Sequence, residues 1–329
     1  MAKQEISILG GGSWGTALAV VLSQRFEKVH LWVHNPVLAE AMQSARENST
    51  YLPGFQLPEN VSVSSQFKSA PWLLSVVPSK HLRAVLGEVT KSLSEPTRLI
   101  SATKGIEAGT FLRMSEVATD CLGAKLSGSP AVLTGPTFAR EIAAGEPAAI
   151  VIASRDNDFA VEVQGAFAGG NLRLYTNTDM AGVELSAAFK NVIAIAAGAV
   201  EGLGLGSNST AAVITRGLAE MSRLVVACGG QASTVSGLAG LGDLVLTCTG
   251  NLSRNRRIGI ELARGRKLAD ILADTKMVAE GVEMTTTALK LAARHQVELP
   301  ISMAVKAMLD GQPALQVLRQ LVDRAPKAE

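Results

Sequence analysis

The hydrophobic pattern changes character about halfway along the chain. The first half contains short, continuously apolar runs, which are typical of strands buried on both faces. These runs cover residues 5–9, 28–33, 73–77, 97–102, 131–134 and 148–153. Segments with helical spacing lie between them, at 15–24, 36–47 and 79–91. This alternation predicts an α/β fold with a parallel, doubly wound sheet of the Rossmann type.

From about Asp179 the chain is rich in Ala, Leu, Glu, Arg and Met, and strand-like runs nearly vanish. The 329 residues also correspond to roughly two domains at about 150 residues each. We therefore expect a first domain over 1–178 and an all-helical second domain over 179–329. Residues 48–60, with two prolines and a glycine, are expected to be a loop within the first domain.

A glycine-rich motif follows the first predicted strand. Residues 10–15 read Gly-Gly-Gly-Ser-Trp-Gly, which fits the pattern G-x-G-x-x-G and leads into a helical segment. In such a motif Gly10 allows a tight turn, Gly12 lets the backbone approach a pyrophosphate, and Gly15 lets the helix pack on the strand. The helix N-terminus also attracts negative charge. The alternative is a purely structural glycine turn, but the strand before and the helix after favour a dinucleotide site.

The second predicted strand ends at His34 and Asn35, where an NAD-binding domain commonly carries a carboxylate. Without that carboxylate a 2′-phosphate is not repelled, and both side chains can donate hydrogen bonds to it. NADP should therefore be tolerated or preferred. A polar strand end before a proline-started helix is the plainer interpretation.

Two further motifs follow buried strands and so belong to the ligand-binding edge of the sheet. Lys104 stands in Thr-Lys-Gly after one strand, and Gly135 and Thr137 stand in a strand-to-helix turn after another. Thr137 is a candidate helix cap. A solvated lysine and simple capping would also explain these residues.

Lys190 is unusual because it lies in a long predicted helix, 179–199, that is otherwise almost entirely small and apolar. Burying an ammonium is costly unless it is paired or serves chemistry, so Lys190 is a candidate acid/base. A lysine whose side chain reaches water at the helix surface is the alternative.

The segment 240–257 combines an acidic glycine turn at Asp243 with a basic helix start. Ser253 can cap that helix, while Arg254 and Asn255 supply donors in its first turn, where the dipole also favours an anion. This start would suit a phosphate, although a solvated basic helix end has the same composition.

Composition excludes several other classes. There are 31 Lys+Arg against 29 Asp+Glu and only 4% aromatic residues, which argues against nucleic acid as a partner. The three cysteines lie far apart and the four histidines form no pair at ligand spacing, so we expect a cytoplasmic protein without disulfides or a metal site. The longest continuous apolar stretch, 192–200, is too short to cross a bilayer, so no membrane insertion is expected.

Taken in order, seven segments resemble the bacterial-type NAD(P)-dependent sn-glycerol-3-phosphate dehydrogenases over nearly the full length. They are GGGSWGTALA, TKG, TGPTFARE, AAFKNV, GLGDL, SRNRRIG and VAEGVEM. The resemblance implies a Rossmann domain followed by a helical domain of the 6-phosphogluconate dehydrogenase type. It also implies reduction of dihydroxyacetone phosphate to sn-glycerol 3-phosphate with NADPH or NADH, for phospholipid synthesis. We expect a homodimer.

The resemblance assigns roles by position. Implied cofactor contacts, besides Gly10, Gly12 and Gly15, are Ser13, Trp14, His34, Lys104, Ala139, Arg254, Val278 and Glu280. Implied substrate contacts are Lys104, Gly135, Thr137, Lys190, Asp243, Ser253, Arg254 and Asn255, and Lys190 would be the acid/base. The strand end at 32–35 differs from commoner versions of the family.

Two other functions share parts of this pattern. A related two-domain dehydrogenase, of the ketopantoate or hydroxyisobutyrate type, would have the glycines and a lysine but not the phosphate site at 253–255. A non-catalytic dinucleotide sensor would need the glycine loop but no acid/base, and Lys190 beside Asn191 argues against it.

Overall fold

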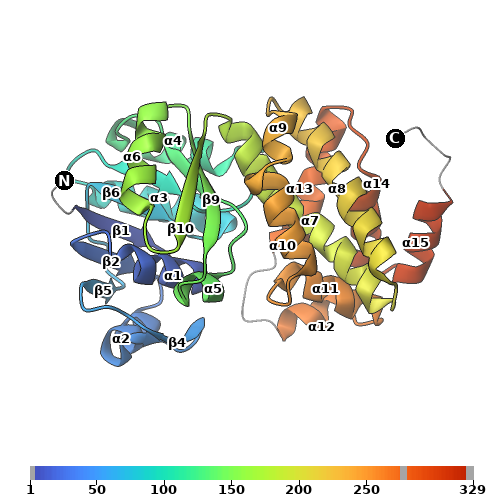
Figure 1. The fold of residues 1–329 in the computed structure, drawn as a ribbon, viewed down its shortest axis with the longest axis horizontal. Coiled ribbons are helices and arrows are strands. Elements are labelled where there is room, and N and C mark those ends of the chain that lie inside the picture. Colours follow the sequence, from blue (N-terminus) through green and yellow to red (C-terminus); the bar gives the residue numbers. More distant parts are fainter. Residues whose placement is uncertain (1–3, 275–279, 324–329) are drawn as a thin grey trace. The chain divides into compact units, whose positions relative to one another are not determined.

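The computed structural model describes residues 4–274 and 280–323, which form two compact units. One unit comprises the chain up to Glu107 together with Leu112–Met180, and the other comprises Ala108–Phe111 and the chain from Ala181 onward. Figure 1 colours the first unit from blue to green and the helices of the second from yellow-green to red.

The first unit is built on an eight-stranded sheet (Figure 1). In spatial order its strands are β10 (Leu172–Asn177), β9 (Ala148–Ser154), β8 (Ala131–Thr134), β7 (Arg98–Ser101), β6 (Trp72–Ser75), β1 (Glu5–Leu9), β2 (Lys28–Trp32) and β5 (Val61–Ser64). Its helices are α1 (Ser13–Leu22), α2 (Pro36–Ala45), α3 (Ser79–Ser92), α4 (Met114–Leu122), α5 (Ala139–Ala143) and α6 (Asn157–Phe167). The predicted α/β class, with a sheet dominated by parallel pairs, is confirmed.

Three details of the first unit differ from the prediction. The β8–β9 pair is antiparallel, a direction that a continuous apolar run does not encode. The edge strands β5 and β10 were missed because they alternate buried and exposed residues, unlike the central strands. The prediction that residues 48–60 are only a loop is wrong. They contain β4 (Leu52–Gln56), which pairs antiparallel with β3 (Glu47–Asn48).

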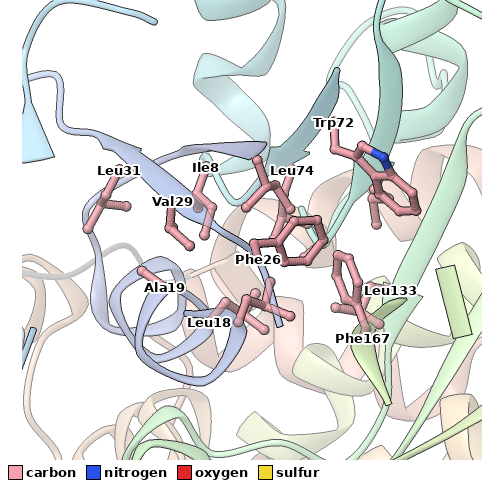
Figure 2. Packing of buried hydrophobic residues seen from close by; sticks show 14 of the residues in the cluster. Ile8, Leu18, Ala19, Phe26, Val29, Leu31, Trp72, Leu74, Leu133 and Phe167 are labelled. Carbon is pink, nitrogen blue, oxygen red and sulfur yellow. The ribbon is translucent and has the colours of Figure 1, made fainter. Parts of the chain in front are cut away.

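Neighbouring residues of the central strands pack into two different hydrophobic clusters. Leu73 packs in a cluster with residues of α3 and α4, whereas Leu74 joins a larger cluster with residues of α1 and α6. Figure 2 shows the larger cluster, in which the rings of Phe26 and Trp72 meet edge to face at 5.9 Å, and Phe167 packs on Phe26 at 5.8 Å. These apolar contacts hold the carboxyl ends of the strands at a fixed edge.

The second unit consists of helices, as predicted. They are α7 (Met180–Gly202), α8 (Ser207–Ala227), α9 (Ala232–Val235), a π-helical turn (Leu238–Gly242), α10 (Asp243–Thr249), α11 (Arg254–Ala263), α12 (Leu268–Ala273), α13 (Glu280–Arg294), α14 (Pro300–Leu309) and α15 (Ala314–Val322). By length and hydropathy α7 is long enough to cross a membrane, but its whole apolar window is buried inside the protein, as in a core helix.

Candidate active site

The glycine loop joins β1 to α1 and has the geometry expected of a dinucleotide motif. Gly10 has a φ of +119°, and a Cβ there would lie 2.9 Å from the Val76 carbonyl oxygen. A Cβ on Gly15 would lie 1.9 Å from the Gly10 carbonyl oxygen, so the helix packs on the strand only with glycine at that position. These contacts explain two of the three predicted glycines by backbone approach alone.

The N-terminus of α1 fits the phosphates of a dinucleotide. Gly12 is the N-cap residue, and within the described chain no side chain caps α1 and no atom lies within 4 Å of where a Gly12 Cβ would stand. Ser13 and Trp14 form the half-buried first turn. Amide donors at an open helix start, without a bulky side chain, are what a pyrophosphate requires.

The end of β2 presents an exposed imidazole. The His34 ring lies 5.7 Å from the ring of Trp32, whose indole donates to the Ser65 carbonyl at 2.9 Å. Asn35 is the N-cap of α2, and its Oδ1 accepts from the Leu38 amide at 3.1 Å. Asn35 therefore has a structural function, and His34 is the better placed of the two to meet a cofactor.

Lys104 follows β7 at the same edge of the sheet as the glycine loop, because β1, β6 and β7 run parallel. The Thr103 hydroxyl bonds the Ser75 hydroxyl at 3.1 Å. Gly105 has a φ of +138°, and a Cβ there would lie 2.7 Å from the side chain of Ser79. The Thr-Lys-Gly motif is thus fixed against the end of β6, and Lys104 is half-buried there.

The turn after β8 also needs glycine, since Gly135 has a φ of +147° and a Cβ there would lie 3.1 Å from the Ile150 Cα. The prediction that Thr137 caps the next helix is wrong. Its hydroxyl donates to the Gly135 carbonyl at 3.2 Å, and Phe138 is the N-cap of α5. Ala139 is the first residue of that helix.

In the second unit Lys190 is buried, with 6% of its surface exposed, so the alternative of a side chain reaching water is wrong. Its Nζ donates to Asp243 Oδ1 and, at 2.9 Å, to Thr247 Oγ1. Asp243 is fully buried. Two buried charges remain ionised at low cost only when paired and hydrogen-bonded, which this arrangement provides.

Asp243 follows the π-helical turn and is the first residue of α10. Thr247 lies four residues later on the same helix face, and its hydroxyl also contacts the Asp243 carbonyl at 2.6 Å. The neighbouring Cys248 is also buried, and burial raises the pKa of its thiol to about 12. The pair therefore acts in surroundings where charge is poorly screened.

The basic helix start has the predicted cap. Ser253 is the N-cap of α11, and its Oγ accepts from the Arg256 amide at 3.3 Å. Arg254 is exposed, whereas Asn255 is buried and its Oδ1 accepts from the Gly281 amide at 3.1 Å. Arg256 forms an ion pair with Glu201 at 2.5 Å. Arg256 therefore anchors the helix, whereas Arg254 and Arg257 are exposed.

Glycines at helix crossings bring these groups near Lys190. A Cβ on Gly259 of α11 would lie 1.9 Å from the Ile195 carbonyl oxygen of α7. One on Gly281 of α13 would lie 2.7 Å from both the Asn191 carbonyl oxygen and Asn255 Oδ1. Backbones that approach this closely fix the Asn255 side chain beside the residue that follows Lys190.

Some expectations were incomplete. Glu280, implied as a cofactor contact, accepts from Asn191 Nδ2 at 3.3 Å. Thr247 was given no role, although its spacing of four from Asp243 was a usable signal. Val278 lies outside the described residues. Over residues 4–274 and 280–323, no three His, Cys, Asp or Glu side chains are grouped so as to hold a metal ion.

Comparison with known proteins gives a consistent family. The N-terminal model of NAD-dependent glycerol-3-phosphate dehydrogenase matches residues 5–160 and the C-terminal model matches residues 179–319. A glycerol-3-phosphate dehydrogenase (NAD(P)+) of Acidobacterium capsulatum is 49% identical over 98% of this chain and 99% of its own, and one of Koribacter versatilis is 47% identical over 98% of each.

A solved structure agrees. The glycerol-3-phosphate dehydrogenase of Coxiella burnetii superposes with a TM-score of 0.93 at 39% identity, over 98% of this chain and 99% of that one. The resemblance carried by the seven sequence segments is thereby confirmed, as is the expectation of NAD or NADP as cofactor. The chain belongs to the NAD(P)-dependent glycerol-3-phosphate dehydrogenases, a family of oxidoreductases.

Proposed function

We propose that this protein reduces dihydroxyacetone phosphate to sn-glycerol 3-phosphate with NADPH or NADH, reversibly, and so supplies the backbone of glycerophospholipids. One observation within the chain carries the proposal: a buried lysine, Lys190, held by Asp243 and Thr247 beside the α7–α11 crossing. Family membership supports the substrate, because the relatives named above are glycerol-3-phosphate dehydrogenases.

The dinucleotide would be held by the glycine loop and the start of α1. Gly10, Gly12 and Gly15 leave the backbone open for the phosphates, and Ser13 and Trp14 would flank them. His34 and Lys104 would add contacts from the ends of β2 and β7, and Ala139 from the start of α5. When bound, the reduced nicotinamide supplies the hydride that reaches the carbonyl carbon.

Lys190 would complete the reaction by giving a proton to the oxygen of the same carbonyl. As that oxygen gains negative charge, the ammonium stabilises it and then protonates it, and the carbonyl becomes an alcohol. Asp243 and Thr247 hold Nζ in one position, which makes Asp243 an orienting group. In the oxidative direction the neutral amine would accept the proton.

The substrate phosphate would bind at the start of α11. Ser253 fixes the helix start, Arg254 supplies a cation, and Asn255 has its oxygen occupied by Gly281, so its Nδ2 is left to donate. Lys104, Gly135 and Thr137 are proposed as further substrate contacts, and Arg254, Val278 and Glu280 as further cofactor contacts, all by resemblance. Binding energy at the phosphate would fix the carbonyl of a short substrate.

Five further expectations complete the proposal. The division into domains 1–178 and 179–329 is supported by the matched segments 5–160 and 179–319. We propose a cytoplasmic homodimer that has no nucleic-acid partner and does not insert into membranes. The burial of α7 supports the last point.

The test is the loss of NADPH absorbance with dihydroxyacetone phosphate and with dihydroxyacetone. Dihydroxyacetone phosphate should react and dihydroxyacetone should barely react, because Arg254 and the start of α11 would hold the substrate through its phosphate. Equal rates on the two ketones contradict the proposal. Reaction with ketopantoate instead of either ketone favours the related two-domain reductases.

A further inference from the structure

A fully buried asparagine outside the predicted site contacts the glycine loop. Asn48 lies in β3, within the segment that the sequence presented as a loop, and none of its surface is exposed. Its Nδ2 donates to the Gly11 carbonyl at 2.9 Å and to Thr16 Oγ1 at 2.8 Å. Its Oδ1 accepts from the Tyr51 amide at 3.1 Å. Both amide protons of Asn48 are therefore directed at the loop and at the first turns of α1.

These bonds help to fix the direction of two backbone amides. Thr16 Oγ1 accepts from Asn48 and donates to the Gly12 carbonyl at 2.8 Å, which also accepts from the Thr16 amide at 3.0 Å, so the carbonyls of Gly11 and Gly12 are both held. In a planar trans peptide the C=O and the next N–H point in opposite directions. Fixing these two carbonyls consequently fixes the N–H groups of Gly12 and Ser13, at the helix start where an anion would bind.

The hairpin that carries Asn48 is itself held firmly. Arg46 precedes it with a φ of +55°, in the left-handed region, which is unfavourable for arginine. Its guanidinium donates to the carbonyls of Leu57 at 3.2 Å, Pro58 at 2.5 Å and Val61 at 2.8 Å. These bonds tie the base of the hairpin to the start of β5. Asn48 is thus presented from a fixed support.

We infer that Asn48 is a positioning residue for the cofactor. Through Gly11 and Thr16 it sets the direction of the amides at the start of α1, and so the affinity of the glycine loop for the pyrophosphate of NADPH or NADH. The inference rests on the proposed function, which supplies the ligand. Asn48 acts through the loop and is not a catalytic residue.

The test compares Asn48→Ala with Asn60→Ala. Alanine is preferred to aspartate because a new carboxylate would repel the cofactor phosphates by itself. Asn60 is a matched control, because its Nδ2 also donates to backbone carbonyls of this unit, those of Ser23 at 2.8 Å and Phe26 at 3.0 Å, after the end of α1. Binding is followed by NADPH fluorescence, and folding by thermal unfolding of the same samples.

Asn48→Ala should weaken NADPH binding about tenfold, the worth of one lost hydrogen bond at the loop, while Asn60→Ala stays within about twofold. Both should lower Tm. The kcat at saturating NADPH should change less than the KM for NADPH. A purely structural Asn48 would instead lower Tm with no change in NADPH affinity, and that result overturns the inference, as does an equal loss of affinity in both variants.

A second pair of variants decides the matter if Asn48→Ala does not fold. Thr16→Val removes the hydroxyl that joins Asn48 to the Gly12 carbonyl and should weaken NADPH binding, and Thr16→Ser, which keeps the hydroxyl, should restore it. Unchanged affinity in Thr16→Val overturns the inference alone, provided that the wild-type protein binds NADPH. A wild-type protein that binds neither NADPH nor NADH overturns the proposed function and the inference with it.

Discussion

Removing the side chain of Lys190 should have two separable consequences. In the wild-type protein the side chains of Lys190 and Asp243 are 7% and 1% exposed, so Lys190→Ala leaves a carboxylate buried without its cation. Breaking a buried pair in this way costs about 3–5 kcal/mol. Loss of a positioned acid/base group lowers turnover about 10²- to 10⁴-fold. Both effects are expected, and each must be measured separately.

The double variant Lys190→Ala with Asp243→Asn separates them. It removes both charges, while the Thr247 hydroxyl keeps its bond to the backbone carbonyl of residue 243. Most of the lost stability should therefore return, but none of the turnover. Lys190→Arg keeps the charge but supplies a group that does not give up its proton, so it should restore little of the rate.

The assays are turnover with NADPH and dihydroxyacetone phosphate, unfolding by denaturant, and NADPH affinity, which should stay within a few-fold because the glycine loop is untouched. Near-normal turnover in a folded, NADPH-binding Lys190→Ala protein removes Lys190 from the mechanism. If the double variant regains turnover together with stability, the loss in the single variant came from misfolding, and the assignment of the proton donor is wrong.

Four other substitutions have definite expected results. Asn35→Asp keeps the cap on α2, since aspartate accepts from Leu38 equally well, but should weaken NADPH binding more than NADH binding; an unchanged ratio of dissociation constants shows that this strand end does not read the 2′-phosphate. Burial raises the pKa of Glu220, so the folded protein holds that proton more tightly than the unfolded chain, and the contribution of this group to stability falls as pH rises toward neutral. The Tm of Glu220→Gln minus that of the wild type should therefore rise over the same pH range. A difference in Tm that does not change with pH contradicts this expectation. Gly259→Ala should destabilise the protein by about 1–3 kcal/mol, because the new Cβ would overlap α7. Gly87→Ala should instead stabilise it by about 0.4–1 kcal/mol, because the new Cβ on α3 meets open space. Unfolding by denaturant measures both changes in the free energy of unfolding.

The sequence predicted the central strands well because a strand covered on both faces must be apolar throughout. The run 131–134 corresponds to β8 residue for residue. The edge strand β5 reads Val-Ser-Val-Ser, with alternate residues buried, so a search for continuous apolar runs passes over it. The antiparallel direction of β9 could not be predicted from the apolar pattern, because its side chains would be equally buried in either direction.

Whether a site residue could be predicted depends on how far away in the sequence its contact partners lie. The cap at Ser253 was predictable because its partner, the Arg256 amide, lies three residues away. Lys190 was recognisable as anomalous, but its partner Asp243 lies 53 residues later, and only folding could show that the two meet. The predicted cap at Thr137 failed because α5 begins one residue later than expected, with Phe138 as its N-cap, and the Thr137 hydroxyl donates back to the Gly135 carbonyl.

Lys190 stood out in the sequence and Asn48 did not, because the two residues differ in how they fit their neighbours. A lysine among alanines and isoleucines conflicts with its neighbours in the sequence, so its chemistry is visible before the fold is known. An asparagine in a polar, proline-containing segment conflicts with nothing, because such residues are ordinary in exposed loops. Asn48 becomes informative only in the folded protein, where it is buried away from water. Its amide nitrogen then donates to one backbone carbonyl, that of Gly11, and to one side chain, that of Thr16. Positioning residues of this kind should therefore be sought among fully buried amides in segments that look like loops, where the cost of burial must be offset by contacts to something that the sequence does not show.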